Sequence, residues 1–492
     1  MPLFNSLLVL FLPVVKSSDG GSLHVDGFRI RIFEILRLPK LSERLEAIER
    51  AGWNTFLLRS DEVFLDMLTD SGVNAMSNEQ LQALVNLQDA YAGSTIYYDF
   101  LRAVNEVLGF RYAYPVHQGR AAEHILSKLF VEPGKTVITN YHFTTTKAHV
   151  ILQKGKMEEQ IVKEAFDTES TYPFKGNMDI EKLRETIKKI GRENIAFIRM
   201  EATTNLVGGQ PFSLENLRQV RQICDEYKIP LVIDGSMIDW NVALIKKREP
   251  GYKNASLVEI LREITSMADI YYASARKAGS VRGGFIATNN EEYAKAISEL
   301  IPVYEGFLTY GGMSLRELSA LAVGIRQMID ESIIDYELRL IEECVEKLSA
   351  KGIPVVKPPG GLGCHINAAK FLPHIPQKEY PAAALASAFY LVSGVRGMER
   401  GSLSLDRLPD GTEIYADLEL LRLAFPRRTY MESHVRYIVD RASWLYRNRD
   451  LVQGLEWVYE PKVLRFFLGR LRDKGSWGRE VARKYLEELG EN

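Results

Sequence analysis

The chain has few cysteines, no excess of basic charge and no hydrophobic run long enough to span a membrane. Cys224, Cys344 and Cys364 are widely spaced, which excludes a CxxC or metal-ligand pattern and indicates buried thiols in a reducing, cytoplasmic compartment. With 62 Lys and Arg against 64 Asp and Glu, there is no basic stripe of the kind that binds nucleic acid. The apolar stretch at residues 7–15 is too short for a membrane span, and no Lys or Arg precedes it as in a signal peptide. We therefore expect a soluble protein without nucleic-acid or membrane partners.

A length of 492 residues exceeds what one hydrophobic core usually serves, so two or more domains are expected. We predict a poorly ordered leader at 1–26, then an N-terminal arm with part of a small domain at 27–76. A large domain is expected at 77–325 and a smaller C-terminal α+β domain at 326–492. No internal repeat interrupts this division.

From residue 77 onward, helical stretches alternate with short apolar strands, which indicates a mostly parallel sheet with helices on both faces. The expected strands are 135–139, 194–198, 231–233, 270–272 and 284–287. The expected helices are 43–51 (capped by Ser42), 62–68, 78–92, 121–130, 214–227, 257–267 and a long one at 314–348.

Two of these strands end in reactive side chains. Asp234 closes the run IPLVID, and Lys277 closes the run ADIYYASARK. A lysine that forms a Schiff base and a carboxylate that holds a pyridine nitrogen protonated suit pyridoxal phosphate (PLP) chemistry. Taken alone the pair is a moderate signal, because an Asp at a strand end is common and a Lys after a strand is more often a solvated loop residue.

Two further segments fit the same chemistry. In His-Gln-Gly-Arg (117–120), a glycine at the start of a helix lets backbone N–H groups approach a phosphate. Phe143 follows the next strand and is placed to stack on an aromatic ring. Each has an ordinary structural explanation, a glycine turn with a surface arginine in the first case and a core phenylalanine in the second.

Eight short segments then appear in a characteristic order and spacing. They are LTDSG (68–72), DAYAGS (89–94), HQGR (117–120), KEAFDT (163–168), NLVGGQP (205–211), YEG (304–306), YGG (310–312) and YEPKVLR (459–465). In these segments the chain resembles the β-eliminating lyase family of tryptophanase and tyrosine phenol-lyase, from about residue 28 to residue 467. The resemblance implies PLP fold type I, the aspartate-aminotransferase-like architecture, with a mostly parallel seven-stranded sheet and a homotetramer whose subunits share active sites.

The resemblance also implies a role for each matching position. Lys277 would carry the cofactor and act as base at the substrate α-carbon, while Asp234 would pair with the pyridine nitrogen. Tyr91 would protonate the leaving aromatic carbon, and Arg422 would bind the α-carboxylate, which suits guanidinium geometry. The other cofactor residues would be Gln118, Gly119, Arg120, Phe143, Ser274 and Arg276; the other substrate residues would be Asn205, Arg400, Thr144, Ser71, Phe466 and Tyr310. The implied reaction is β-elimination of an aromatic L-amino acid to phenol or indole, pyruvate and ammonia.

The sequence also departs from the family pattern. Met237 stands where the family has an arginine that contacts the cofactor's phenolic oxygen. In the family's potassium site, Gly72 is kept, but Asp89 replaces a glutamate and the loop 279–283 is one residue shorter. Potassium is therefore possible but in doubt, and Arg282 is a candidate to replace the charge of the ion.

The substrate stays open between tyrosine and tryptophan. Arg400, Phe466 and Thr144 match the tyrosine phenol-lyase form, in which the arginine recognises the phenol hydroxyl. The alternative is that Arg400 is a structural ion-pair residue and that the substrate is tryptophan. Met237 also leaves room for an aminotransferase or a β-lyase on another amino acid. A non-catalytic relic is disfavoured, because Lys277, Asp234, Tyr91 and Arg422 are all present.

Overall fold

The computed structural model describes residues 14–16, 22–24, 29–30, 32–85, 90–408 and 410–491. In the predicted leader, β1 (Val14–Lys16) pairs antiparallel with β2 (Ser22–His24), and the other leader residues lie outside the described ones. Within the described ranges, no helix combines the length and the apolar character needed to cross a membrane. The three cysteines are buried free thiols, as expected.

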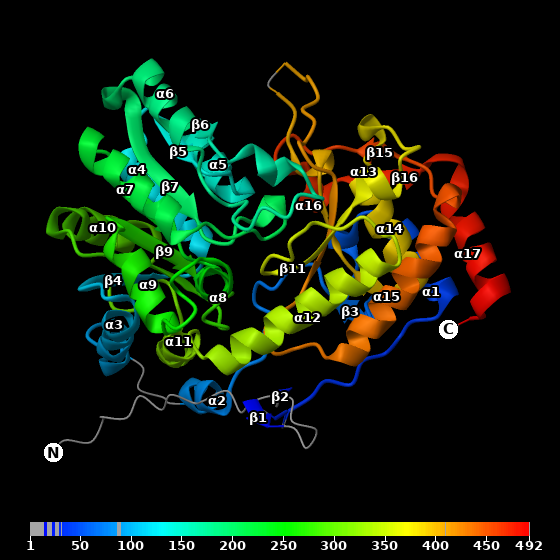
Figure 1. Cartoon of the computed structure of the whole chain (residues 1–492), viewed down its shortest axis with the longest axis horizontal. Helices are drawn as coiled ribbons and strands as arrows, with labels where there is room; N and C mark the ends of the chain where they lie inside the picture. The colour runs from blue at the N-terminus through cyan, green and yellow to red at the C-terminus, as the bar shows by residue number, and fades with distance from the viewer. Residues whose placement is uncertain are drawn as a thin grey trace.

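A seven-stranded sheet organises the larger part of the chain (Figure 1). Its order is β4 (Tyr112–Val116), β10 (Gly284–Thr288), β9 (Ile270–Ser274), β8 (Leu231–Asp234), β7 (Ile195–Glu201), β5 (Thr136–Thr139) and β6 (Lys156–Glu159). The strands from β9 to β6 run parallel, and β10 is antiparallel to its two neighbours. The predicted mostly parallel sheet is confirmed. The sequence prediction missed β4 and also β6, an edge strand whose charged residues lie at the surface.

Alternation along the strands gives the sheet two separate apolar faces, as the period-two geometry of a strand requires. Leu231 and Ile233 of β8 join one core, whereas Val232 between them joins the other. The first face is covered by α3 (Thr95–Leu108), α6 (Ile180–Ile190), α7 (Leu214–Tyr227), α8 (Ile238–Arg248), α9 (Leu257–Ser266) and α11 (Leu315–Gln327). The second is covered by α4 (Gly119–Phe130), α5 (Thr144–Leu152) and α10 (Glu291–Tyr304).

The smaller part of the molecule has its own core, built from both ends of the chain. An antiparallel sheet of β11 (Gly363–Asn367), β14 (Leu420–Ala424) and β13 (Met398–Arg400) lies at its centre. Around it lie α1 (Leu41–Arg50), α12 (Glu331–Ala350), α13 (Ala368–Phe371), α14 (Pro381–Ser393), α15 (Glu432–Arg447), α16 (Arg465–Leu468), α17 (Trp477–Leu489) and the hairpin β15 (Leu455–Tyr459)–β16 (Arg470–Asp473). In Figure 1, α12 runs between the two parts. These separate cores support the predicted division into domains, whose boundaries stay a prediction.

Three predicted helices differ from the structure. The long helix at 314–348 is two helices, because the Asp330 side chain accepts from the Ser332 N–H and starts α12 anew. The predicted helix at 62–68 is wrong, since residues 65–66 form β3 (Leu65–Asp66), which pairs with β12 (Val395–Arg396). The third, predicted over 78–92, forms only as α2 (Asn78–Leu84), and residues 86–89 are outside the described ranges.

One predicted cap is also wrong. Ser42 does not cap α1 but lies inside it, and its hydroxyl donates to Glu491. The Glu43 carboxylate instead accepts from the Lys40 N–H at the start of that helix. The Glu43 carboxylate in the first turn thus caps the start of the helix, where Ser42 had been predicted to do so.

Candidate functional site

A cavity of about 390 Å³ lies where the carboxyl ends of the parallel strands meet the smaller part of the chain. This edge is the usual ligand site of an open α/β sheet. The sheet register brings the predicted residues there, since Asp234 ends β8 and Ser274 ends β9. The predicted residues that line the cavity are Ser71, Gln118, Gly119, Arg120, Phe143, Thr144, Asn205, Asp234, Ser274, Arg276, Lys277, Arg400, Arg422 and Phe466.

Lys277 is held by a buried ion-pair network. Its Nζ lies 3.3 Å from Asp70 Oδ1, and Arg427 Nη1 donates to Asp70 Oδ2 at 2.8 Å. Burial alone would raise the pKa of Asp70, but the cations of Lys277, Arg427 and Arg422 hold this pKa below its ordinary value. The carboxylate therefore stays ionised and fixes the amine at the cavity wall.

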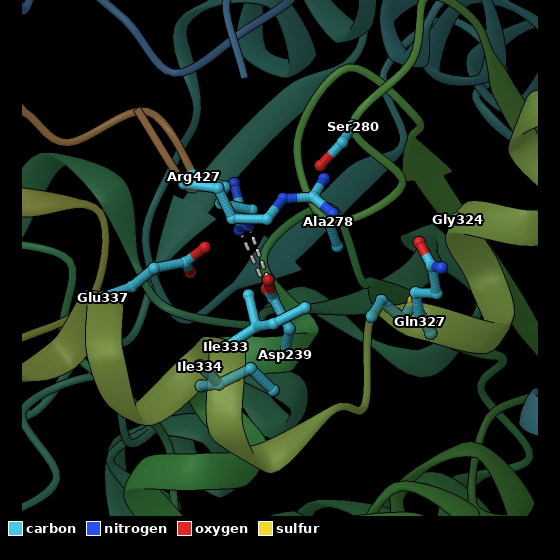
Figure 2. A pocket seen from close by; sticks show the side chains of 11 residues that line it. Asp239, Ala278, Ser280, Gly324, Gln327, Ile333, Ile334, Glu337 and Arg427 are labelled. Carbon is cyan, nitrogen blue, oxygen red and sulfur yellow. Dashed lines mark hydrogen bonds and ion pairs between the residues drawn. The ribbon is translucent and has the colours of Figure 1, made fainter. Parts of the chain in front are cut away.

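The same ion-pair network borders a second, much smaller cavity of about 20 Å³, shown in Figure 2. Asp239 receives two hydrogen bonds from Arg427, of 2.6 and 2.9 Å, and both side chains line this cavity with Ala278 and Ser280. The volume suits a single water molecule. This second cavity borders the segment that follows Lys277 and is too small for a substrate.

Asp234 is held equally firmly. Oδ1 accepts from Ser236 N at 3.0 Å and from Ser236 Oγ at 2.7 Å. Oδ2 accepts from Arg199 Nη2 at 2.6 Å and from the Tyr272 hydroxyl at 2.9 Å. Only 5% of the residue is exposed, at the floor of the cavity. The carboxylate is therefore fixed in position before it meets any ligand.

An anion cradle lies at the start of α4. No side chain caps this helix, and a Cβ added to Gly119 would lie 2.8 Å from Ser274 Cβ, so only glycine fits here. Uncapped N–H groups at a helix start favour a phosphate. Burial, and then the neighbouring guanidinium groups of Arg282 and Arg120, lower the pKa of Arg276, so a dianion here would relieve cation repulsion.

Arg422 and Asn205, both predicted to bind the substrate, contact each other in the cavity. Arg422 Nη1 donates to Asn205 Oδ1 at 2.7 Å, and Nη2 donates to the Leu68 carbonyl at 2.8 Å. Nε is buried and has no hydrogen-bond partner among the described residues. Burial and the nearby Arg400 lower the pKa of Arg422. An incoming carboxylate would supply the missing acceptor and the missing negative charge.

Arg400 is the second buried guanidinium of the cavity. Its Nε and Nη1 find no partner in the part of the chain that the structure describes, and its Cζ lies 5.9 Å from the centre of the Phe143 ring. Burial lowers the pKa of Arg400 to about 10. The rings of Phe466 and Phe467, tilted by 32° with centroids 4.0 Å apart, form an apolar wall of the same cavity. The arrangement suits an aromatic group with a polar substituent.

The structure does not bring every predicted residue into this cavity. Tyr91 is 73% exposed, and its ring packs on Phe307 and Tyr310 outside the cavity. Gly72 has φ of +83° and donates its N–H to the Arg276 carbonyl. Its predicted partner in cation binding, Asp89, lies outside the described residues.

Sequence reasoning missed four polar residues that surround Asp234. Arg199 and Glu201 are on β7, Tyr272 is on β9 and Glu123 is on α4; all but Arg199 line the cavity. An available signal was the pattern Ile-Arg-Met-Glu at the end of a strand that is otherwise apolar. Charged residues in a buried strand are rare unless they are paired, and the predicted strand at 194–198 ended before both of them.

Comparisons with known proteins identify the family of the chain. A family model described as beta-eliminating lyase matches residues 66–441. The tyrosine phenol-lyase of Symbiobacterium thermophilum is 42% identical over 447 residues, covering 90% of this chain and 98% of that protein. For the tyrosine phenol-lyase of Intrasporangium calvum the identity is 43%, with 90% and 94% covered. A tryptophanase of Salinibacter ruber is 39% identical, with 92% and 96% covered.

Solved structures share the fold. A serine palmitoyltransferase of S. paucimobilis with bound PLP superposes with a TM-score of 0.56 at 13% identity, over 79% of this chain and 89% of that chain. A Sphingomonas wittichii serine palmitoyltransferase gives a TM-score of 0.57 at 12% identity, over 84% and 97%. At this identity the likeness concerns architecture alone.

Proposed function

Because the chain belongs to the β-eliminating lyase family, we propose that it cleaves L-tyrosine to phenol, pyruvate and ammonia with PLP as cofactor. The chain has PLP fold type I, as the resemblance implied. It is a lyase of the family that contains tyrosine phenol-lyase and tryptophanase. The choice of tyrosine is the specific part of the proposal.

The residues of the cavity fit PLP. Lys277 offers an amine, the start of α4 offers uncapped N–H groups beside Ser274, and Asp234 lies at the floor. When bound, PLP supplies an electron sink for the charge that develops at the substrate α-carbon. Lys277 would then accept the α-proton, while Asp234 would hold the pyridine nitrogen in its protonated form. Arg422 and Asn205 would orient the α-carboxylate, and Phe143 would stack on the ring.

Arg400 is the observation that carries the choice of substrate. Its Nε and Nη1 donors are buried in the cavity beside Phe143 and have no acceptor among the described residues. A phenol or phenolate oxygen is an acceptor, whereas the indole N–H is only a donor. Leaving a buried charged donor unpaired is costly, so the cavity favours the hydroxylated ring.

A second copy of the chain completes the proposed site. Tyr91 is assigned as the acid that protonates the leaving carbon, yet within one chain its ring lies outside the cavity and is largely exposed. We propose a homotetramer in which Tyr91 and Tyr310 of one subunit face the cavity of the next. The three buried free thiols fit a cytoplasmic location for this assembly.

Met237 favours one competing function. It lines the cavity and is 2% exposed, where the family has an arginine at the cofactor's phenolic oxygen. Without that donor, amino transfer or β-elimination from a non-aromatic amino acid becomes a candidate reaction.

The deciding experiment measures pyruvate release by purified, PLP-loaded protein with L-tyrosine and L-tryptophan separately, with and without potassium. Pyruvate with phenol supports the proposal, and pyruvate with indole identifies a tryptophanase. Pyruvate from neither, with keto-acid-dependent amino transfer, would replace the proposal with the competing function. A rate that is the same without potassium would mean that the Gly72 and Asp89 segment binds no required ion.

A further inference from the structure

A buried arginine backs the acid that would hold the pyridine nitrogen. Arg199 and Glu201 are two residues apart on β7, so their side chains lie on the same face of the sheet. In the register of the sheet, Glu201 is opposite Asp234, and Asp234 is opposite Tyr272. Three neighbouring strands thus place a guanidinium, two carboxyl groups and a phenol side by side.

Arg199 is fully buried, and its donors are directed at this group and, through Nη1, also at the Thr139 hydroxyl and the Tyr141 carbonyl, each at 3.3 Å. Nη2 donates to Asp234 Oδ2 at 2.6 Å, Nε donates to the Tyr272 hydroxyl at 2.9 Å, and Nη1 lies 3.4 Å from Glu201 Oε2. The Tyr272 hydroxyl in turn donates to the same oxygen of Asp234. A buried guanidinium is tolerated only when it is paired in this way. The pairing holds Asp234 from the side away from the cavity.

These contacts use the accepting capacity of Asp234 almost fully. A carboxylate has about four lone-pair positions, and Ser236, Arg199 and Tyr272 already supply four donors. Part of the negative charge of Asp234 is therefore balanced from inside the protein. How strongly Asp234 attracts a proton on a ligand nitrogen then depends on how much of the Arg199 charge other groups take up.

Glu201 is the group placed to compensate the positive charge of Arg199. Its Oε1 accepts from the Asn205 N–H at 3.2 Å, and its Oε2 faces Arg199. Burial and the neighbouring Asp234 raise the pKa of Glu201 to about 7, although Arg199 opposes the shift. Glu123 is also buried, but the hydroxyls of Thr145 and Thr146 bind its two oxygens at 2.6 Å.

We propose that Arg199 and Glu201 act together as positioning residues for Asp234 and set how strongly the protein holds a protonated cofactor nitrogen. Arg199 fixes the Asp234 carboxylate and withdraws part of its charge, and Glu201 offsets the charge of Arg199 and returns that attraction. The inference rests on the proposed use of PLP, but not on which amino acid is cleaved. It assigns a function to two residues that lie outside the eight short segments on which the family resemblance was based.

The test is a double-substitution cycle on the full-length chain, Glu201→Gln, Arg199→Met and the pair together. In E201Q the uncompensated Arg199 acts wholly on Asp234, so the dissociation constant for PLP should rise about tenfold, which equals one pKa unit. The pH midpoint of the absorption change of bound PLP should fall in the same variant. In the double variant, which removes one positive and one negative charge, both quantities should return toward the wild-type values.

Restoration separates this electrostatic function from ordinary packing, because two purely structural losses would add. Glu419→Gln, which removes a buried carboxyl that binds Ser402 and lies outside the cavity wall, should leave the spectrum unchanged. The proposal is wrong if E201Q binds PLP with wild-type affinity and midpoint, or if the double variant is no better than E201Q.

If the chains carrying Arg199→Met do not fold, the midpoint of E201Q decides alone, since an unmoved midpoint refutes the coupling. The groups that interact electrostatically with Asp234 and enter this titration are Arg199, Glu201, Tyr271, Tyr272, Glu123 and, through Arg199, His142. A wild-type protein that binds PLP but releases no pyruvate would refute the proposed function and leave this inference to be decided by the same measurements.

Discussion

Replacing Arg400 by methionine tests the choice of substrate most directly. The change removes the guanidinium but keeps a long side chain against Phe143 and the Phe466 wall. A hydrogen bond to a charged donor contributes about 1.5–3 kcal/mol, so loss of one bond to the phenol oxygen should lower kcat/KM for L-tyrosine about 10- to 150-fold. Arg400→Lys keeps the positive charge but not the forked geometry of the guanidinium, so its kcat/KM for L-tyrosine should lie between those of the parent chain and of Arg400→Met.

The assay is pyruvate release with two substrates. 3-Chloro-L-alanine carries a leaving group that needs no contact with the aromatic part of the cavity, so its kcat/KM should change by less than about threefold. Two donors of Arg400 are unpartnered among the described residues, so R400M should also unfold at the same temperature as the parent chain or a higher one. Equal losses with both substrates, or a marked drop in Tm, would refute substrate recognition and restore the ion-pair interpretation of Arg400.

Four further predictions follow from the same geometry. Lys277→Ala should abolish the visible absorption band of bound cofactor and its covalent trapping by borohydride, and retention of either would remove Lys277 from its assigned function. Tyr91→Phe should keep the cofactor but lose phenol release, and mixing it with Lys277→Ala subunits should recover activity only if subunits share sites; activity assays of refolded mixtures check this. Gly119→Val should weaken PLP binding in a spectroscopic titration, because its Cβ would meet Ser274 Cβ at 2.8 Å. Burial lowers the pKa of His365 to about 3, so the unfolded state binds more protons than the folded state between about pH 3 and 6.5. The free energy of unfolding should therefore decrease as the pH is lowered through this range, by about 1.4 kcal/mol per pH unit. His365→Asn should flatten this slope in urea titrations at pH 4.5 and 7.

The sequence was sufficient for the part of the fold that repeats locally. The strand end at Asp234 and the glycine that opens α4 are signals carried by a few adjacent residues, and each lies where it was expected. The break between α11 and α12 was missed because it depends on one side chain: Asp330 starts a new helix inside an apolar pattern that continues through it. Periodicity alone cannot show such a break.

Of the candidate site, the sequence predicted side chains that line the cavity but not the buried partners that hold them. Lys277 could be assigned from its motif, but its partner Asp70 is 207 residues away, and Arg427 is 357 residues from Asp70. Nothing local in the sequence says which carboxylate a buried lysine will meet, because the pairing is decided by how the two parts of the chain close on each other. The same holds for Arg199, whose purpose becomes visible only when β7, β8 and β9 lie in register.

Met237 and Arg199 are best understood together. The resemblance places an arginine at the position of Met237, beside the phenolic oxygen of the cofactor, and this chain has an uncharged, buried side chain there. It has instead a guanidinium behind Asp234, the residue assigned to the ring nitrogen. An arginine at the position of Met237 would raise the tendency of the cofactor to draw electrons, whereas Arg199 behind Asp234 would lower it, so the two positions are not equivalent. Glu201, next to Arg199 and with a pKa of about 7, is the residue in this cluster that can offset the difference.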